Sequence, residues 1–262
     1  MYETIKLEMD GPMARLTLNR PERANAMTMA MGEELGAAIE TIRAAPEARV
    51  LLLTGAGRHF CAGADMAEFE RLQSSPPAEV ETAVRVFLDA IGEMHRLPIP
   101  VIARINGDAY GGGIGLALAC DLRVMATSAR MGFTFLRVGL SGADAGVTYF
   151  LPRIVGPARA AEILFLGKVV DGETAIQMGL VHRAVPLEEL DNVTEKLVAQ
   201  LAAGPPLATR TTKDGLVNSL TRSMTEAFNF EARAQTACMM SADHREGVQA
   251  FQEKRVPVFI GE

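Results

Sequence analysis

The sequence predicts an α/β fold that ends in a helical region. Between about residues 4 and 186, short apolar runs alternate with glycine-containing loops and with helix-like segments. Near the N-terminus, Asp10-Gly11-Pro12-Met13 separates two alternating runs, as expected of a hairpin. After Pro186 only helix-like segments follow. A four-helix bundle would not contain these strands, so we expect a strand-loop-helix core from 1 to 186 and a helical region from 187 to 262.

Each expected element in the first half of the chain has a local signal. Apolar residues recur at the helical period from Thr28 to about Arg43, and again from about Ala78 to His95. The run Arg49 to Thr54 is apolar and ends at glycine, which favours a buried strand. We therefore expect strands at 4–9, 14–18, 49–54 and 99–105, helices at 28–43 and 78–95, and a short helix after residue 64.

The second half continues the pattern and then becomes helical. Leu140 to Asp144 has turn composition, and a helix is expected to begin at Ala145. Further strands are expected at 121–126, 130–133 and 181–185, and shorter helices at 157–166 and 172–178. Four helices are expected in the tail, at 187–203, 205–219, 221–242 and 245–253. Gly204-Pro-Pro206 separates the first two of them.

Composition excludes several classes of function. The formal charge is −6, and no basic run interleaved with aromatic residues is present, so nucleic acid is not an expected partner. The three cysteines and four histidines lack metal-ligand spacing, and we expect no metal site. No apolar run approaches the ~18 residues of a membrane span, and no secretion signal is evident. We expect a reduced, cytoplasmic protein without a membrane partner.

The most informative stretch is 98–121, where a predicted buried strand is followed by Gly111-Gly112-Gly113 and an apolar helix. The first turn of a helix has unpaired N–H groups and positive polarity, so glycines there let a ligand oxygen reach the backbone. Tight helix packing is the alternative explanation. Neither glycine frame completes G-x-G-x-x-G, and a Walker A loop is absent, so a nucleotide-phosphate site is rejected.

The run from Pro100 to Asp121 resembles the signature of the crotonase superfamily, also called the enoyl-CoA hydratase/isomerase family. Asn19-Arg20-Pro21, Phe60-Cys-Ala-Gly-Ala-Asp65 and Gly179-Leu-Val181 are also similar to its motifs, in the family's order. The resemblance implies a crotonase-like spiral of β-β-α turns with a helical tail that packs at a trimer interface. It also implies an acyl-CoA thioester substrate, no cofactor beyond the CoA within that substrate, and a homotrimer or dimer of trimers.

The resemblance further assigns roles to individual residues. Two backbone N–H groups, those of Ala64 and Gly112, are expected to stabilise the thioester oxygen as it becomes an enolate. The expected CoA contacts are Arg23, Ala24 and Ala26 along the pantetheine, Ala62, Asp65 and Met66 at the adenine, and Lys254 at the phosphates, within the chain or from a neighbouring subunit. For Arg23 and Lys254, ordinary surface charge is the alternative. Near the glycines, Tyr110, Gly111 and Phe135 are expected at the substrate, although Tyr110 could simply pack.

The proton carrier decides the reaction. Classical hydratases of the family have two glutamates, and the matching residues here are Gly115 and Phe135, which cannot move a proton. The remaining candidate is Asp144, which could act as acid and base or only cap the following helix. We expect its apolar surroundings to be Phe133, Phe135, Leu140, Tyr149 and Phe150. A single base fits double-bond isomerisation of an enoyl-CoA best. The alternatives are hydration with non-standard residues, acyl-CoA hydrolysis or dehalogenation, and non-catalytic acyl-CoA binding.

Overall fold

The structure, a computed structural model, describes residues 2–262. Its main sheet has the strand order β1-β2-β3-β4-β6-β9, in which β1 and β2 form an antiparallel hairpin and the later neighbours are parallel. A smaller sheet has the order β5-β7-β8. The strands are β1 (Ile5–Asp10), β2 (Met13–Leu18), β3 (Val50–Gly55), β4 (Val101–Ile105), β5 (Ala109–Tyr110), β6 (Leu122–Ala126), β7 (Arg130–Gly132), β8 (Val169–Asp171) and β9 (Arg183–Val185).

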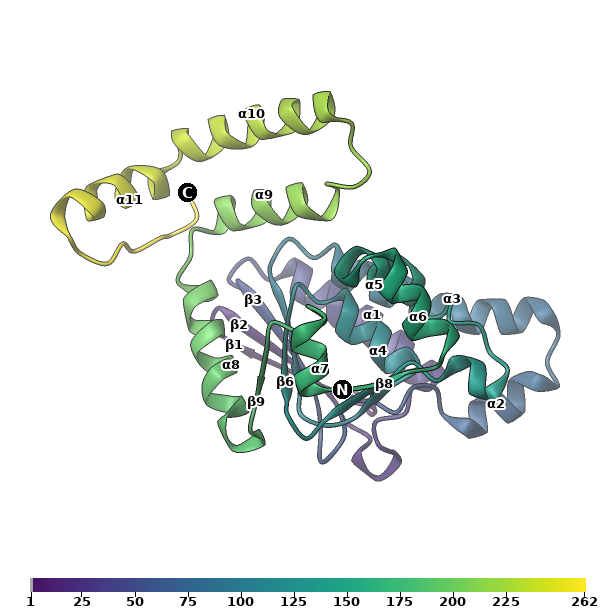
Figure 1. The fold of residues 1–262 in the computed structure, drawn as a ribbon. Helices are drawn as coiled ribbons and strands as arrows, with labels where there is room; N and C mark the ends of the chain where they lie inside the picture. Colours follow the sequence, from purple (N-terminus) through teal and green to yellow (C-terminus); the bar gives the residue numbers. More distant parts are fainter. Residues whose placement is uncertain (1) are drawn as a thin grey trace.

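Helices lie around the two sheets and continue beyond them in the C-terminal part of the chain (Figure 1). They are α1 (Met29–Ala44), α2 (Met66–Gln73), α3 (Pro77–His95), α4 (Gly112–Ala119), α5 (Val147–Val155), α6 (Pro157–Phe165), α7 (Gly172–Gln177), α8 (Leu187–Ala202), α9 (Pro206–Val217), α10 (Met224–Met240) and α11 (Ala242–Glu253), with short 3₁₀ turns at Pro21–Arg23 and Phe135–Val138.

The main sheet is buried on both faces, as its continuous apolar strands require. Side chains of a strand alternate between the faces. In β3, Leu51 and Leu53 therefore join the large core with α1, α3 and α4, whereas Val50 and Leu52 pack with Val198 of α8 on the other face. This sandwich fixes the carboxyl ends of β3 and β4, from which the candidate site is built.

The expected β-β-α turns are present. Two of the turns add one strand to each sheet: β4 and β5 precede α4, and β6 and β7 precede α5. The sequence did not predict β5 and β8, because strands of two or three residues have too few positions to show a period, and only their pairing with β7 defines them. The helix expected at Ala145 begins instead at Val147, since Ala145 and Gly146 have φ values of +48° and +75°.

Helices α9 to α11 and the C-terminal segment after them, residues 206–262, project from the body; we call this part the arm (Figure 1). It is tethered by Lys213, whose buried ammonium lies 2.8 Å from the Asp121 carboxylate and donates to the Ile99 carbonyl. By contrast, α8 packs on the sheet, and the domain boundary at residue 187 remains a prediction. Within residues 2–262, no helix is long and apolar enough to cross a membrane.

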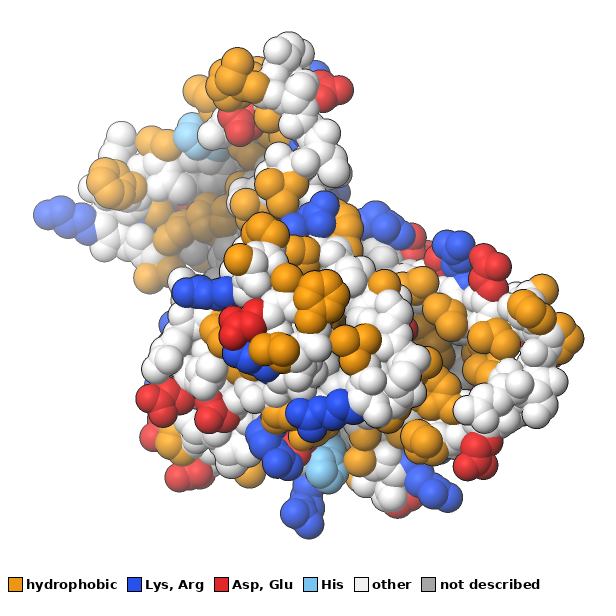
Figure 2. Space-filling model, turned by 45° about the vertical axis from the view of Figure 1, so that its right-hand side comes forward, with side chains coloured by type: hydrophobic (Ala, Val, Ile, Leu, Met, Phe, Trp, Pro, Cys, Tyr) orange, Lys and Arg blue, Asp and Glu red, His pale blue; other side chains and the backbone are white. Residues whose placement is uncertain are grey.

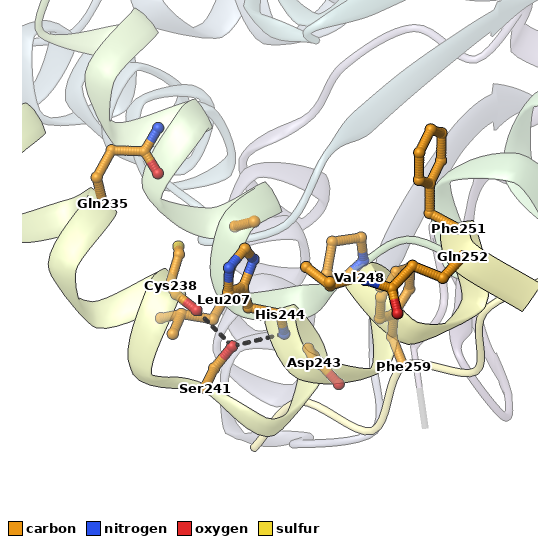
Figure 3. A pocket seen from close by; sticks show the side chains of 13 residues that line it. Leu207, Gln235, Cys238, Ser241, Asp243, His244, Val248, Phe251, Gln252 and Phe259 are labelled. Atoms are coloured by element: carbon orange, nitrogen blue, oxygen red, sulfur yellow. Dashed lines mark hydrogen bonds between the residues drawn. The ribbon is translucent and has the colours of Figure 1, made fainter.

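The arm exposes many large apolar side chains, which Figure 2 shows along its length. Among them, Met240 is 73% exposed and Phe251 is 85% exposed. A groove of about 540 Å³ runs between α9, α10 and α11. It is lined by apolar side chains and by the polar residues Gln235, Ser241, Asp243, His244 and Gln252 (Figure 3). Exposed apolar surface of this kind is typical of contact sites between proteins.

Candidate active site

Two loops of the body meet edge to edge at the candidate site. The N–H of Tyr110 donates to the Cys61 carbonyl at 2.9 Å, and an isolated bridge joins Cys61 to Ala109. A second isolated bridge joins Ala64 to Met27, which lies in a third segment. The loops are so close that a Cβ on Gly63 would lie 2.9 Å from the Tyr110 oxygen and 3.4 Å from the Gly112 nitrogen. Gly63 also has φ = +90°. A side chain at position 63 would therefore push the loops apart.

The two backbone donors predicted from the sequence have no acceptor within residues 2–262. In the bridge, the N–H of Met27 donates to the Gly63 carbonyl and the N–H of Asp65 donates to the Met27 carbonyl, which leaves the N–H of Ala64 between them free. Gly112 is the first residue of α4, so its N–H has no partner in the helix. Ala64 and Gly112 line the same cavity.

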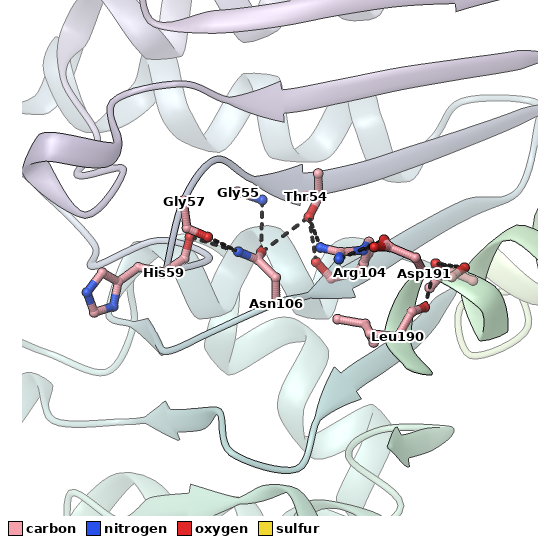
Figure 4. Close-up of polar contacts among 9 residues, drawn as sticks. Thr54, Gly55, Gly57, His59, Arg104, Asn106, Leu190 and Asp191 are labelled. Atoms are coloured by element: carbon pink, nitrogen blue, oxygen red, sulfur yellow. Dashed lines mark hydrogen bonds and ion pairs between the residues drawn. The ribbon is translucent and has the colours of Figure 1, made fainter. Parts of the chain in front are cut away.

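Two asparagines hold these loops in place. The buried amide of Asn25 donates to the carbonyls of Ala56 and His59 at 2.9 and 2.8 Å. Figure 4 shows Asn106, which accepts hydrogen bonds from the N–H of Gly55 and the hydroxyl of Thr54 and donates to the Gly57 carbonyl. Because the amides bind loop backbone rather than ligand, they fix the path of the chain toward Ala64. Sequence reasoning missed both roles.

Asp144 lines the same cavity as the two donors. It is not the cap of α5: the N-cap is Gly146, and no side-chain oxygen caps that helix. The turn is closed through the Asp144 carbonyl, which accepts from the N–H of Val147 at 2.8 Å. Burial raises the pKa of the Asp144 carboxyl, although a hydrogen bond from the N–H of Ala145 opposes the shift. The capping alternative is therefore wrong, and the carboxyl remains available for chemistry.

The apolar walls of the cavity come from α2 and α3, not from the residues expected. Phe69 and Leu72 of α2 and Phe87 and Leu88 of α3 line it. The expected surroundings were Phe133, Phe135, Leu140, Tyr149 and Phe150, none of which lines this cavity. Proximity in sequence to Asp144 suggested them, whereas tertiary packing supplies a different set. The free volume of the cavity is about 80 Å³.

A second carboxylate, Glu68 on α2, also lines the cavity. Its side chain is 27% exposed and lies 3.4 Å from the Arg71 guanidinium. Helix α2 has only 8 residues, too few for the apolar pattern in the sequence to show which face is buried. The sequence therefore did not indicate that Glu68 faces the cavity.

The residues expected to contact CoA mostly cluster beside the donors. The Ala62 N–H donates to the Ala24 carbonyl, and Arg20 bonds both the Ala26 carbonyl and the Asp65 carboxylate, at 2.6 and 2.9 Å. The Asp65 carboxylate also caps α2 by accepting a hydrogen bond from the N–H of Ala67. Burial acts to raise the pKa of Asp65, but the hydrogen bonds from Arg20 and Ala67 and the charges of Arg20 and Arg23 lower it overall. Arg23 and Met66 are exposed.

Three other expected residues lie differently. Lys254 ends α11 in the arm, which Figure 1 places at the opposite end of the molecule from α2, so it does not approach the donors of its own chain. The Tyr110 ring covers Gly132, where a Cβ would be 2.0 Å from it, which is a packing position. Phe135 is buried, and a Cβ on Gly111 would lie 3.9 Å from its ring.

Two other reactive groups are occupied, Cys61 beside the site and His95 at the far end of α4. Burial raises the pKa of the Cys61 thiol to about 12, and its Sγ donates to the Asn25 carbonyl. His95 is hydrogen-bonded to the Ala119 carbonyl at 3.0 Å and packs edge-on against Phe150. In the described part of the chain, residues 2–262, no group of three or more metal-binding side chains is present.

Comparison with known proteins identifies the family and the fold. Residues 8–262 match the family model described as "Enoyl-CoA hydratase/isomerase". A "Probable enoyl-CoA hydratase" of Rhodobacter capsulatus is 40% identical over 99% of each chain, and the 1,2-epoxyphenylacetyl-CoA isomerase of Escherichia coli is 35% identical over all of both. The crystal structure of an enoyl-CoA hydratase from Bacillus anthracis has a TM-score of 0.93 at 34% identity, covering 99% of this chain and 100% of that one. The similarity confirms the predicted crotonase-like fold.

Proposed function

The chain belongs to the enoyl-CoA hydratase/isomerase family, and from this premise we propose that it moves the double bond of an enoyl-CoA thioester, with Asp144 as the acid and base. One observation carries the proposal. Two unpaired backbone N–H groups, of Ala64 and Gly112, and the half-buried carboxyl of Asp144 share one apolar cavity. Donors preorganised in a site that excludes water stabilise developing oxygen charge.

In the proposed reaction the substrate is a 3-enoyl thioester. The Asp144 carboxylate removes a proton from the α-carbon, and the electron pair moves onto the thioester oxygen to give a dienolate. The N–H groups of Ala64 and Gly112 bind that oxygen. The protonated Asp144 then returns the proton to the γ-carbon, which yields the 2-enoyl thioester with all atoms conserved. A base with its pKa raised toward neutrality is suited to both steps, and burial has that effect on Asp144.

The test is Asp144→Asn, with trans-3-hexenoyl-CoA as the probe. We expect turnover to fall by about 10²–10⁴-fold, the usual contribution of general acid–base catalysis, while the affinity for the thioester stays nearly unchanged. The matched control is Asp89→Asn, which makes the same charge change at an exposed position of α3. Equal turnover in the two variants would remove Asp144 from the mechanism.

Hydration is the second candidate, and Glu68 favours it because two carboxylates then line one cavity. One could orient a water molecule while the other delivers a proton to the 2-enoyl thioester. Incubation of crotonyl-CoA in ¹⁸O-labelled water separates the two reactions, because only hydration or hydrolysis places solvent oxygen in the product. Loss of that labelled 3-hydroxyacyl product in Glu68→Gln would support hydration. Labelled free acid would indicate a hydrolase. A dehalogenase would keep the thioester and would be detected by the halide that it releases from a halogenated acyl-CoA. CoA binding without deuterium exchange at the α- or γ-carbon of the substrate would indicate a binding protein.

We also propose the CoA contacts expected from the sequence, with CoA as part of the substrate and no further cofactor. Arg23 is exposed beside the loop that carries Ala64, and its charge acts on Asp65 there. Arg23→Gln should raise KM for the thioester and leave kcat unchanged. An unchanged KM would assign Arg23 to ordinary surface charge.

We also propose that the protein assembles as a homotrimer or a dimer of trimers and that it is located in the cytoplasm. The exposed apolar face of the arm supports self-association, since it includes Met239, Met240 and Phe251. In such an assembly Lys254 of one chain could reach the CoA phosphates bound to a neighbour. Light scattering after size-exclusion chromatography measures the assembly directly, and Met240→Glu, placed on that face, should shift it toward monomer.

A further inference from the structure

Gly115 touches the turn that carries Asp144. It lies in α4, one turn of helix after the donor Gly112, and is fully surrounded. A Cβ at position 115 would lie 2.1 Å from the Ala145 carbonyl oxygen and 2.5 Å from the Ala145 Cβ. Non-bonded atoms do not approach this closely, so the backbone of the turn occupies the space that any side chain at position 115 would need. Only glycine allows this contact.

The turn itself is held in an unfavourable conformation. Ala145 has φ = +48°, a left-handed value that alanine rarely adopts, and it is buried at 2% exposure. Such a residue costs on the order of 1–3 kcal/mol and persists only where the surrounding structure enforces it. Here the enforcing surface is α4. The Ala145 backbone rests on Gly115, and its methyl group faces Gly112, where a Cβ would be 3.8 Å away.

The contact between Ala145 and α4 links the Asp144 carboxyl to the proposed oxyanion donor, the N–H of Gly112. Asp144 precedes the strained residue directly, and Gly112 begins the helix on which that residue rests. A proton carrier must lie within hydrogen-bond reach of the carbon that it deprotonates, while the thioester oxygen stays on the donor. The distance between carboxyl and donor is therefore set by how Ala145 sits on the first turns of α4.

We propose that Gly115 and Ala145 are positioning residues, which together hold the Asp144 carboxyl at a fixed place relative to the Gly112 N–H. The inference rests on the proposed function, because it assumes that Asp144 transfers the proton. Ala145→Gly removes the conformational restriction without adding bulk. Gly115→Ala displaces the turn by adding one carbon. Both changes alter the position of the carboxyl and leave its chemistry intact.

The experiment compares Ala145→Gly and Gly115→Ala with Gly36→Ala, a control on α1 where the added Cβ meets nothing within 4 Å. With trans-3-hexenoyl-CoA as the probe, kcat should fall roughly 10- to 100-fold in both variants, the effect of a misplaced catalytic group. KM should change by less than about threefold, because the proposed CoA contacts are untouched and Ala145→Gly removes only one methyl group from the cavity lining. The thermal midpoint of Ala145→Gly should remain near the wild-type value, since relief of strain offsets the lost methyl group and the added chain freedom.

Wild-type kcat in Ala145→Gly would overturn the inference, and so would a loss of kcat that only accompanies unfolding. Ala145→Gly decides the matter even where Gly115→Ala does not fold, because it introduces no clash. Asp144→Asn, measured in parallel, separates the two hypotheses. Full turnover in Asp144→Asn would refute the proposed function. Loss of turnover there, with wild-type kcat in Ala145→Gly, would refute only the positioning role.

Discussion

Gly63→Ala would perturb the proposed oxyanion site without removing any polar group. The new Cβ would lie 2.9 Å from the Tyr110 carbonyl oxygen and 3.4 Å from the Gly112 nitrogen, and both neighbours are backbone atoms. They can yield only if the two loops separate by some tenths of an ångström. The N–H groups of Ala64 and Gly112 would then no longer converge on one oxygen.

The magnitude follows from the loss of one donor. Removal of a single oxyanion-hole donor typically lowers kcat by about 10²–10³-fold, equivalent to roughly 3–4 kcal/mol. Alanine at φ = +90° also strains the backbone, at a cost on the order of 1–3 kcal/mol of stability. We therefore expect kcat for trans-3-hexenoyl-CoA to fall by about two orders of magnitude, together with a moderate drop in the thermal midpoint.

The matched control is Gly11→Ala in the β1–β2 turn. Gly11 also has a positive φ, +51°, but a Cβ there meets nothing within 4 Å. This variant loses some stability through backbone strain and should retain full kcat. Steady-state kinetics and thermal melts on both variants give the comparison. If Gly63→Ala turns over as fast as Gly11→Ala, the approach of the two loops does not matter to catalysis and the oxyanion assignment is refuted.

Further predictions concern protonation, loop anchoring and thiol exposure. Because burial raises the pKa of Asp144 above 3.8, kcat/KM should fall as the pH drops through that raised value, and a flat pH–rate profile would contradict its role as base. The raised pKa also means that ionised Asp144 destabilises the fold, so Asp144→Asn should raise the thermal midpoint at neutral pH and lose this advantage in acid, as calorimetry can measure. Asn25→Ala should lower the unfolding free energy in urea by about 2–3 kcal/mol, because buried carbonyls lose their donors; a change below 0.5 kcal/mol would argue against the anchoring role. Iodoacetamide should modify the partly exposed Cys238 in the native protein and spare Cys61 and Cys120, whose pKa values burial raises to about 12.

Elements with a clear period could be predicted from the sequence. The hairpin, β3, β4 and the helices α1 and α3 follow from alternation or from a 3.6-residue repeat of apolar side chains, because these patterns reflect which face is buried. The short strands β5 and β8 could not be predicted. Two or three residues have no period, and pairing partners distant in the sequence define them.

The candidate site, like the fold, could be predicted from the sequence only in part. Glycines before an apolar helix indicated either a backbone site or tight helix packing, and the family resemblance placed the donor at Gly112. The same resemblance indicated an unusual proton carrier, because position 115 lacks the classical glutamate. Nothing local indicated that α2 and α3 would supply the apolar walls, or that Glu68 would face the cavity. Those contacts join segments far apart in the chain, and no short sequence window contains both sides of them.

By itself, then, the sequence determined the family motifs, the strand and helix periods, and the loss of both classical glutamates at Gly115 and Phe135. Only the tertiary structure decided that Asp144 is not a helix cap, that its turn rests on the bare backbone of α4, and that Lys254 lies far from the donors of its own chain. The reason is physical. Local sequence sets backbone preferences and the buried face of each element, whereas burial of a charge and the approach of two loops depend on every element that packs around them.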